Sequence, residues 1–303
     1  MNLLITGAWR NAKEYIKKLE NKGCCIKYMQ QETESLPCDY PWVEGIICNG
    51  IFLTHSIELF VNLKYIQLTS VGFDRVPIDY VNDRGIKIYN AHGVYSIPMA
   101  EFAVSAVLQF YKQSHFFYKN QSQHRWEKNR NLLELYGQTV CVIGCGNVGN
   151  ECAKRFQAFG CKVIGVDSQK CQGTYYDAIY PIDNINDALA LSDIIILAVP
   201  LNEDTYHFMD KSRFDCMKQS AVLINIARGA VIDTKDLIQK APELGCVVLD
   251  VFEEEPLPSS SPLWEMENVI ITPHNSFVSN NNDIRLSKVI FNHLFDELAG
   301  TIR

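Results

Sequence analysis

The stretch from Val140 to Asp167 constrains the fold of this chain more than any other, and it reads VCVIGCGNVGNECAKRFQAFGCKVIGVD. A short apolar run leads into three glycines spaced G-x-G-x-x-G. An amphipathic segment follows, and then a second apolar run that ends on an acid. This order predicts a strand, a tight turn, a helix lying on a sheet, and a second strand parallel to the first. The chain is therefore predicted to contain a parallel α/β sheet.

The three glycines of this stretch have different physical tasks. Gly144 allows a tight turn where the strand ends, and Gly146 lets the backbone approach a pyrophosphate because it has no side chain. Gly149 permits close packing of the helix on the strand. A helix that begins near Asn147 and Val148 would point its free N–H groups and its positive dipole end at the phosphate. These residues predict a dinucleotide-binding turn.

Asp167 ends the second strand of the same unit. A carboxylate at this position accepts hydrogen bonds from both ribose hydroxyls of an adenosine and repels a 2′-phosphate. G-x-G-x-x-G alone is a weak signal, but strand, glycines, helix, strand and terminal acid occur together here, as the motif requires. The sequence therefore predicts NAD, rather than NADP, as the cofactor.

Short apolar runs alternate with amphipathic or polar segments along the whole chain. The first series lies at 2–6, 25–29, 45–48, 65–69 and 86–90, and the second at 139–144, 161–167, 193–199, 221–227, 246–252 and 268–274. Strands that alternate with helices form parallel sheets covered on both faces. Two such series predict two doubly wound domains.

Two segments indicate how the domains follow one another. Residues 96–120 are apolar around nearly the whole helical circumference, which predicts a helix buried on all sides, either between two lobes or at a subunit interface. Residues 281–300 are predicted to form a terminal helix that returns the chain to the first lobe. We therefore expect a Rossmann NAD-binding domain at 95–275, inserted in a flavodoxin-like substrate domain made of 1–94 and 276–303.

Composition excludes several classes of function. The formal net charge is −7, and no run of Lys or Arg offers a surface for nucleic acid. No apolar stretch is long enough for a membrane span, and the N-terminus does not resemble a signal peptide, so a cytoplasmic location is expected. The eleven cysteines form no CxxC pair and no cluster with zinc spacing, which predicts reduced structural thiols and no metal site.

Polar side chains follow three of the later strands. Arg228 comes after 221–227, the acidic run Glu253 to Glu255 comes after 246–252, and His274 ends 268–274. The carboxyl ends of parallel strands meet at one edge of a sheet, where open α/β sheets bind ligands. His207 and the other histidines lack a comparable strand-end setting with a carboxylate candidate.

Hydride transfer between NAD and a 2-hydroxy acid requires three groups that these positions supply. His274 would move the hydroxyl proton, a glutamate would stabilise the protonated imidazole, and Arg228 would hold the substrate carboxylate. The residues alone leave open which of the three glutamates takes part.

The ordered motifs resemble those of the D-isomer-specific 2-hydroxyacid dehydrogenase family along essentially the whole chain. They are VIGCGNVG at 142–149, LINIARGAVID at 223–233, LDVFEEEP at 249–256 and ITPH at 271–274, together with TSVGFDRVPID at 69–79. In that family the catalytic glutamate directly precedes the proline, which here selects Glu255. The catalytic arginine and histidine of the family match Arg228 and His274.

The same resemblance implies further site residues. Asp250 would hydrogen-bond the nicotinamide carboxamide, and the backbone of Val71 and Gly72 would bind the substrate carboxylate. Cofactor contacts are also implied at Val199, Pro200, Thr205, Ile226 and Ala227. Family members usually dimerise through the coenzyme lobe, so a homodimer that uses the 96–120 helix and the QHRWEKNR arm (123–130) is expected.

The sequence departs from the family in the loop at 48–55. Relatives often have a basic residue there, whereas this chain has Asn49 and Phe52, which weakens the case for a phosphorylated substrate. Asn49, Phe52 and Tyr95 would instead line a pocket for a small or apolar acid, or Phe52 would pack inside its lobe.

We therefore expect an NAD-dependent oxidoreductase that interconverts a 2-oxo acid and a D-2-hydroxy acid. Two alternatives remain open. One is oxidation of 3-phosphoglycerate, and the other is a non-enzymatic NAD(H)-sensing scaffold that resembles the corepressors of this family.

Overall fold

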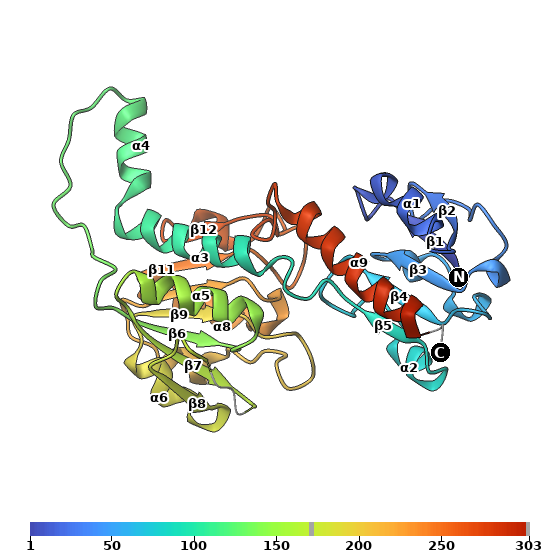
Figure 1. Cartoon of the computed structure of the whole chain (residues 1–303). Helices are drawn as coiled ribbons and strands as arrows, with labels where there is room; N and C mark the ends of the chain where they lie inside the picture. The colour runs from blue at the N-terminus through green and yellow to red at the C-terminus, as the bar shows by residue number, and fades with distance from the viewer. Residues whose placement is uncertain (170–172, 301–303) are drawn as a thin grey trace. The chain divides into compact units, whose positions relative to one another are not determined.

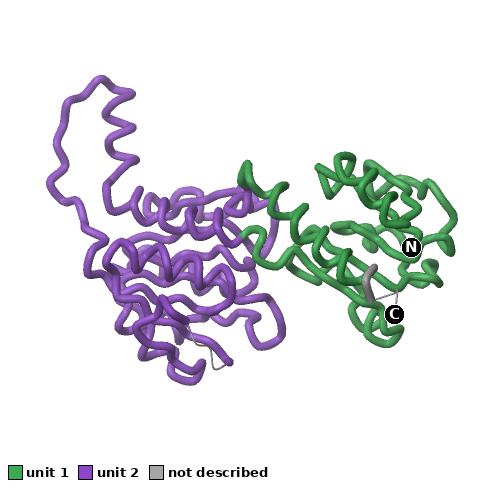
Figure 2. The backbone as a smooth tube through the Cα atoms, viewed as in Figure 1, with its two compact units in different colours: residues 1–95, 279–303 green, residues 96–278 purple. Residues whose placement is uncertain are grey.

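The computed structural model describes residues 1–169 and 173–300, with the backbone alone for 298–300. The chain divides into two compact units, shown in different colours in Figure 2. Unit 1 comprises Met1–Tyr95 and Ser279–Arg303, and unit 2 comprises Ser96–Val278. Within the described ranges, the helices lack the combination of length and apolar character that crossing a membrane requires.

Unit 1 is a five-stranded parallel sheet in the order β2-β1-β3-β4-β5. Its strands are β1 (Asn2–Thr6), β2 (Cys25–Met29), β3 (Gly45–Cys48), β4 (Tyr65–Leu68) and β5 (Lys87–Tyr89), and its helices are α1 (Ala12–Glu20), α2 (Ile78–Asp83) and α9 (Asn282–Gly300) (Figure 1). The central strands β1, β3 and β4 are buried along nearly their whole length, as expected for a sheet covered on both faces.

The strand order of unit 1 has one topological switch point, between β1 and β3. The chain leaves β1 toward β2 on one side, then returns and continues through β3, β4 and β5 on the other. Leu3, Leu4 and Ile5 of β1 pair with 45–47 of β3, so the two strands end side by side. In sheets with this order, ligands bind outside the carboxyl ends of the two strands at the switch point.

Unit 2 is a seven-stranded parallel sheet in the order β12-β11-β10-β9-β6-β7-β8. The strands are β6 (Thr139–Ile143), β7 (Lys162–Asp167), β8 (Ala178–Pro181), β9 (Ile194–Leu197), β10 (Val222–Asn225), β11 (Cys246–Leu249) and β12 (Val269–Ile271). Helices α3 (Ser96–Tyr111) and α5 (Asn147–Ala158) cover one face. Helices α6 (Ile185–Leu191), α7 (Lys211–Asp215) and α8 (Thr234–Lys240) cover the other.

These sheets confirm the predicted pair of doubly wound domains, and each predicted apolar run forms a strand. Strand β8 was not predicted, because its four residues carry no long apolar run. The single helix expected at 96–120 is wrong. α3 ends at Tyr111 and α4 (Ser114–Ser122) follows, because Gln113 adopts a left-handed backbone with φ 52°. Phe117 and Tyr118 of α4 are exposed instead of buried.

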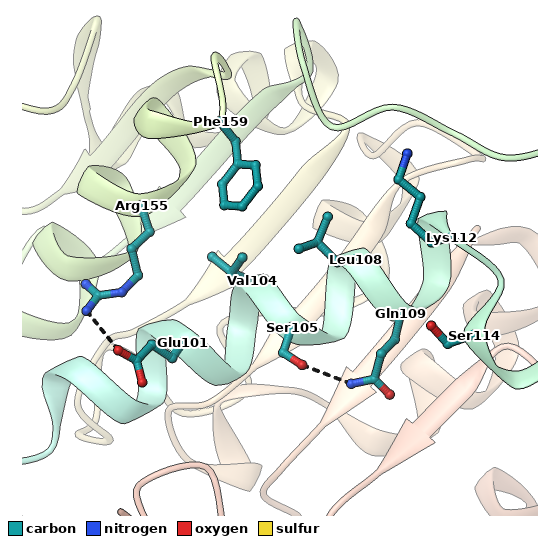
Figure 3. A pocket seen from close by; sticks show the side chains of 9 residues that line it. All are labelled: Glu101, Val104, Ser105, Leu108, Gln109, Lys112, Ser114, Arg155 and Phe159. Carbon is teal, nitrogen blue, oxygen red and sulfur yellow. Dashed lines mark hydrogen bonds and ion pairs between the residues drawn. The ribbon is translucent and has the colours of Figure 1, made fainter. Parts of the chain in front are cut away.

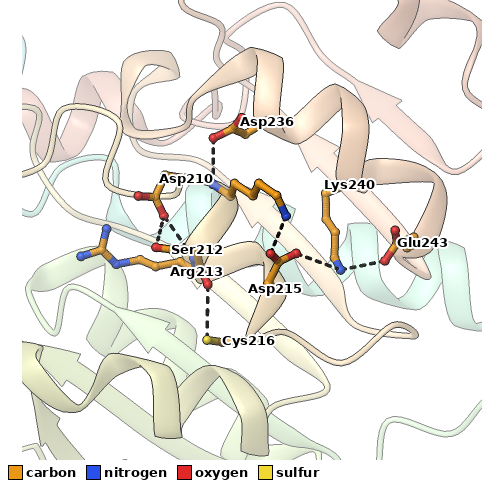
Figure 4. Close-up of polar contacts among 9 residues, drawn as sticks. Asp210, Ser212, Arg213, Asp215, Cys216, Asp236, Lys240 and Glu243 are labelled. Atoms are coloured by element: carbon orange, nitrogen blue, oxygen red, sulfur yellow. Dashed lines mark hydrogen bonds and ion pairs between the residues drawn. The ribbon is translucent and has the colours of Figure 1, made fainter.

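Short helices α7 and α8 are joined by a network of polar contacts (Figure 4). The Asp210 carboxylate caps α7 by accepting the backbone N–H of Arg213, and Asp236 accepts the N–H of Lys211 at 2.8 Å. Lys240 lies between Asp215 and Glu243, with Nζ 2.7 Å from the Glu243 carboxylate. The network fixes α7, which follows the 198–210 loop, against α8, which follows Asp233.

Replacing Asp210 with Ala is expected to destabilise the protein by about 1 kcal/mol, the usual effect of losing a helix cap. Burial raises the pKa of the Asp210 carboxyl, but hydrogen bonds from Ser212 and Arg213 outweigh it and lower the pKa overall. The stabilisation is therefore fully present at neutral pH and is lost as the pH falls through the lowered pKa. Urea unfolding at neutral and acidic pH measures both effects. Asp210→Asn is the control that retains a capping oxygen, and equal midpoints for Asp210→Ala and wild type would contradict the assignment.

Candidate active site

The glycine turn after β6 has the geometry of a phosphate cradle. Gly144 has φ 96°, and a Cβ there would lie 2.6 Å from the carbonyl oxygen of Ala198. A Cβ on Gly149 would lie 2.0 Å from the carbonyl oxygen of Gly144, so helix α5 approaches the turn as closely as glycine allows. At Gly146, by contrast, a Cβ would meet no atom within 4 Å. The turn is therefore closed toward the sheet and open at Gly146.

Helix α5 begins at Asn147, and no side chain caps it from Gly146. An uncapped helix N-terminus of this length leaves donors and a positive dipole end for an anion. Asp167 ends β7 beside the turn, where Oδ2 accepts the backbone N–H of Cys145 at 2.8 Å and Oδ1 accepts that of Gln169 at 2.9 Å. The predicted ribose-binding carboxylate is thus held against the predicted phosphate-binding loop.

The remaining predicted cofactor positions differ in accessibility. Val199 lies next to Gly144, with its Cγ1 3.0 Å from where a Gly144 Cβ would be. Thr205 donates from Oγ1 to the carbonyl oxygen of Pro200 at 2.7 Å, which holds the loop after β9. The side chains of Ile226 and Ala227 are buried in the core, so only their backbone could face a ligand.

Three neighbouring strands bring together the residues predicted to carry the chemistry. Arg228, Glu255 and His274 follow β10, β11 and β12, which are adjacent in the sheet. His274 Nδ1 lies 2.9 Å from Glu255 Oε2, and the other carboxylate oxygen accepts the backbone N–H of Phe252 at 3.0 Å. The two side chains are 41% and 38% exposed, so the pair is accessible to a small molecule. Among the described residues, His274 Nε2 has no hydrogen-bond partner.

The arginine loop packs directly on the glutamate loop. A Cβ on Gly229 would lie 1.8 Å from the carbonyl carbon of Phe252, so only glycine fits between them. Asn225, fully buried, accepts the N–H of Ala227 and donates to the carbonyl oxygen of Arg228. Arg228 Nη1 donates to the carbonyl oxygen of Ala227 at 2.8 Å. The guanidinium is therefore fixed beside its own loop and retains donors for an anion.

Asp250 is fully buried and binds the segment that carries His274. Its carboxylate accepts Thr272 Oγ1 at 2.6 Å and the backbone N–H groups of Asn275 and Ser276 at 2.8 and 3.0 Å. Its carbonyl oxygen accepts the N–H of His274. His274 has φ 50°, a left-handed conformation that non-glycine residues rarely adopt. A contact of Asp250 with the nicotinamide carboxamide stays a prediction.

His207 has two carboxylate contacts that the sequence analysis did not predict. Its Nε2 lies 2.5 Å from Glu253 Oε1 and its Nδ1 lies 3.2 Å from Asp233 Oδ2. Burial raises the pKa of Glu253, but hydrogen bonds from Thr234 and His207 outweigh it and lower the pKa overall. His207 joins the loops after β9, β10 and β11, and no sequence spacing indicates this, because the three loops are far apart along the chain.

In unit 1, the loop after β4 carries the predicted carboxylate-binding backbone. The Asn90 side chain donates to the carbonyl oxygen of Val71 at 2.7 Å, and Tyr95 Oη donates to that of Thr69 at 2.5 Å. Within the described part of the chain, the N–H groups of Val71 and Gly72 have no acceptor. Tyr95 thus anchors the base of this loop, and two backbone donors stay open.

In the loop after β3, the second of the two interpretations of Phe52 is confirmed, since its side chain packs inside the lobe. The ring of Phe52 packs edge-on against buried Phe60, with centroids 6.0 Å apart. The backbone N–H groups of Asn49 and Gly50 are bound by the carboxylate of Glu32, at 2.7 and 2.6 Å. Glu32 was missed by the sequence reasoning, because a single acid in a polar loop carries no signal.

Comparison with known proteins identifies the family of the chain. The model for the D-isomer specific 2-hydroxyacid dehydrogenase, NAD binding domain, matches residues 104–276. A glyoxylate reductase of Thermofilum pendens is 33% identical over 272 residues, covering 85% of this chain and 79% of the relative. A D-3-phosphoglycerate dehydrogenase of Methanocaldococcus jannaschii is 35% identical over 234 residues, which cover 76% of this chain and 44% of that longer protein.

A solved structure shows that the likeness extends to both units. D-lactate dehydrogenase from Aquifex aeolicus, complexed with NAD and lactic acid, is 25% identical with a TM-score of 0.80, covering 99% of this chain and 96% of that one. The matched domain is an NAD-binding domain, and the glycine turn, the uncapped helix and Asp167 suit that cofactor. The chain belongs to the D-isomer specific 2-hydroxyacid dehydrogenase family.

Proposed function

We propose that this protein reduces a 2-oxo acid to the D-2-hydroxy acid with NADH, and catalyses the reverse oxidation with NAD. The observation that carries the proposal is the 2.9 Å contact between His274 and Glu255, in the unit that also holds the glycine turn. Following NADH absorbance with a panel of 2-oxo acids tests it. Turnover of at least one acid is expected, whereas tight NADH binding without any turnover would favour a scaffold.

Each of the three side chains has a separate role in this reaction. His274 donates the proton from Nε2 to the carbonyl oxygen of the substrate, and takes it back in the oxidative direction. Glu255 accepts a hydrogen bond from Nδ1–H, which fixes the tautomer and stabilises the protonated ring. Arg228 pairs with the substrate carboxylate and polarises the adjacent carbonyl. The bound nicotinamide supplies or accepts the hydride.

The residues of unit 2 would hold the cofactor in a defined orientation. The open turn at Gly146 and the N-terminus of α5 bind the pyrophosphate, and Asp167 accepts the hydroxyls of the adenosine ribose. Val199 borders the same turn, and the loop after β9 that carries it also contains Pro200 and Thr205, which are joined by a hydrogen bond. The N–H groups of Val71 and Gly72 in unit 1 bind the substrate carboxylate.

A small, unphosphorylated acid such as glyoxylate is the substrate that fits best. Several relatives are named glyoxylate reductase, and the 48–55 loop contains no Lys or Arg. Oxidation of 3-phosphoglycerate is the second candidate, because the relative from Methanocaldococcus jannaschii has that name. A phosphorylated substrate requires donors or a cation for its phosphate.

The protein acts as a homodimer through unit 2. Trp126 is 97% exposed on the extended segment 123–135. A cavity of about 520 Å³ lies against α3 and α5, and Val104, Leu108 and Phe159 form its apolar part (Figure 3). Glu101, Gln109, Lys112 and Arg155 give it a polar rim. The arm (123–130) presents an indole, and the cavity lies on the same chain. Under two-fold symmetry, the arm of one subunit fits the cavity of its partner.

Loss of the acid–base pair should abolish most turnover. His274→Ala and Glu255→Gln are each expected to lower kcat by about 10²–10⁴-fold, because they remove the proton donor or the group that orients it. NADH affinity, measured by fluorescence, should stay within about twofold. Glu254→Gln is the matched control, since that exposed carboxylate lies next to Glu255 in sequence. Nearly full activity of His274→Ala would rule out this histidine as the acid.

Removal of the charge on Asp167 should weaken the preference for NADH over NADPH. Asp167→Asn retains an oxygen for the N–H of Cys145, so it isolates the charge from the loop contact. The ratio of kcat/KM for NADPH to that for NADH is expected to rise about tenfold, because repulsion of the 2′-phosphate disappears. Asp187→Asn on α6 serves as the control. An unchanged ratio would show that Asp167 does not face the ribose.

Substitution of Trp126 tests the assembly. Light scattering coupled to gel filtration should give twice the chain mass for the wild type and a lower mass for Trp126→Ala, because the exposed indole is the largest apolar group on the arm. Trp264→Ala, at another exposed tryptophan of unit 2, should leave the mass unchanged. A monomeric wild type, or a Trp126→Ala dimer of undiminished stability on dilution, would contradict the arrangement.

A further inference from the structure

Glu32 occupies an anion-binding position at the edge of the sheet in unit 1. Its Oε1 accepts Thr6 Oγ1 at 2.6 Å and the backbone N–H of Asn49 at 2.7 Å. Its Oε2 accepts the N–H of Gly50 at 2.6 Å, and its carbonyl oxygen accepts Thr54 Oγ1 at 2.9 Å. Two successive backbone N–H groups and a hydroxyl together form a site for an anion, and a carboxylate of the chain itself fills it.

The position of this carboxylate in the fold is informative. Thr6 ends β1, and Asn49 and Gly50 follow β3, so Glu32 lies at the topological switch point of the β2-β1-β3-β4-β5 sheet. Sheets of this order bind their ligands outside the carboxyl ends of these two strands. In this chain a tethered acid from the loop after β2 takes the place that a ligand's anionic group would occupy.

The occupied site lies next to the open one after β4. The N–H of Thr69 donates to the carbonyl oxygen of Cys48 at 2.8 Å, which joins the ends of β3 and β4. Arg75 Cδ lies 3.4 Å from where a Gly50 Cβ would be, so the two loops are in contact. One loop therefore presents the open donors of Val71 and Gly72, and its neighbour presents donors already bound to Glu32.

We propose that Glu32 is a specificity-determining residue that restricts the enzyme to 2-oxo acids with a single anionic group. The inference rests on the proposed function and on binding of the substrate carboxylate by Val71 and Gly72. Acids that carry a second carboxylate or a phosphate are disfavoured, because that group would have to displace a covalently tethered carboxylate or lie beside its charge. Neutral substituents meet neither obstacle.

The test compares substrates within each variant, which separates specificity from a general loss of activity. Specificity constants are measured for glyoxylate and pyruvate, and for oxaloacetate and phosphonooxypyruvate, with wild type, Glu32→Gln, Glu32→Ala and Glu34→Gln. Glu34 is an exposed acid two positions away, so Glu34→Gln removes one charge from the same loop without touching the donors. In both Glu32 variants, the specificity constant for acids with two anionic groups, divided by that for acids with one, should rise about tenfold or more. The same ratio should stay at the wild-type value in Glu34→Gln.

Two outcomes would overturn the inference. One is a wild type whose specificity constants for acids with two anionic groups equal those for acids with one. The other is a pair of active Glu32 variants whose ratio stays within about twofold of wild type. A wild type that reduces no 2-oxo acid would instead overturn the proposed function. Whether Glu32 fills an anion site would then be decided by anion binding, without reference to turnover.

Inorganic phosphate is the probe for that binding measurement. Glu32→Ala leaves the N–H groups of Asn49 and Gly50 and the hydroxyl of Thr6 open to an external anion. Exchange of chloride for phosphate at equal ionic strength should raise the Tm of Glu32→Ala by about 2–4 °C relative to the same exchange in wild type. An equal response of the two proteins would mean that Glu32 does not fill an anion site.

Discussion

The segment that carries His274 depends on its contacts with the buried carboxylate of Asp250. This carboxylate binds Thr272, Asn275 and Ser276 at once, and the backbone of the same residue binds the N–H of His274. These bonds offset the strain of a left-handed histidine and hold the imidazole toward the glutamate loop. Because Asp250 is buried, its carboxylate needs hydrogen-bond donors from the protein, and one short segment supplies them to both of its oxygens.

The strand order of the sheet in unit 2 brings the other residues of the candidate site to one edge. β10, β11 and β12 are neighbours, so Arg228, Glu255 and His274 follow adjacent strands although they lie 27 and 19 residues apart in sequence. Gly229 lets the first two loops touch at the backbone, and His207 joins both to the loop after β9. The site is therefore built on rigid strand ends whose loops are cross-linked to one another, as proton transfer at a fixed distance requires.

The parts of the site that follow directly from apolar runs could be predicted from the sequence. Strand ends can be read from apolar runs, so Arg228 and His274 could be assigned to one sheet edge before the structure was known. The choice of Glu255 among three adjacent acids needed the family resemblance. His207 and Glu32 were not predicted, because their partners lie on loops distant in sequence. The break between α3 and α4 was missed because Gln113, unlike glycine, gives no sign that it adopts a left-handed backbone.

Three groups of backbone N–H donors at strand ends, among the described residues, differ in whether the chain itself binds them, and this difference bears on the proposed choice of substrate. The turn at Gly146 is open and suits a pyrophosphate, and the donors of Val71 and Gly72 are open and suit one carboxylate. The donors of Asn49 and Gly50 are bound by Glu32. Under the specificity proposed above, the number of anionic groups in the substrate is limited by which donors the chain satisfies itself, and Glu32 closes the third position.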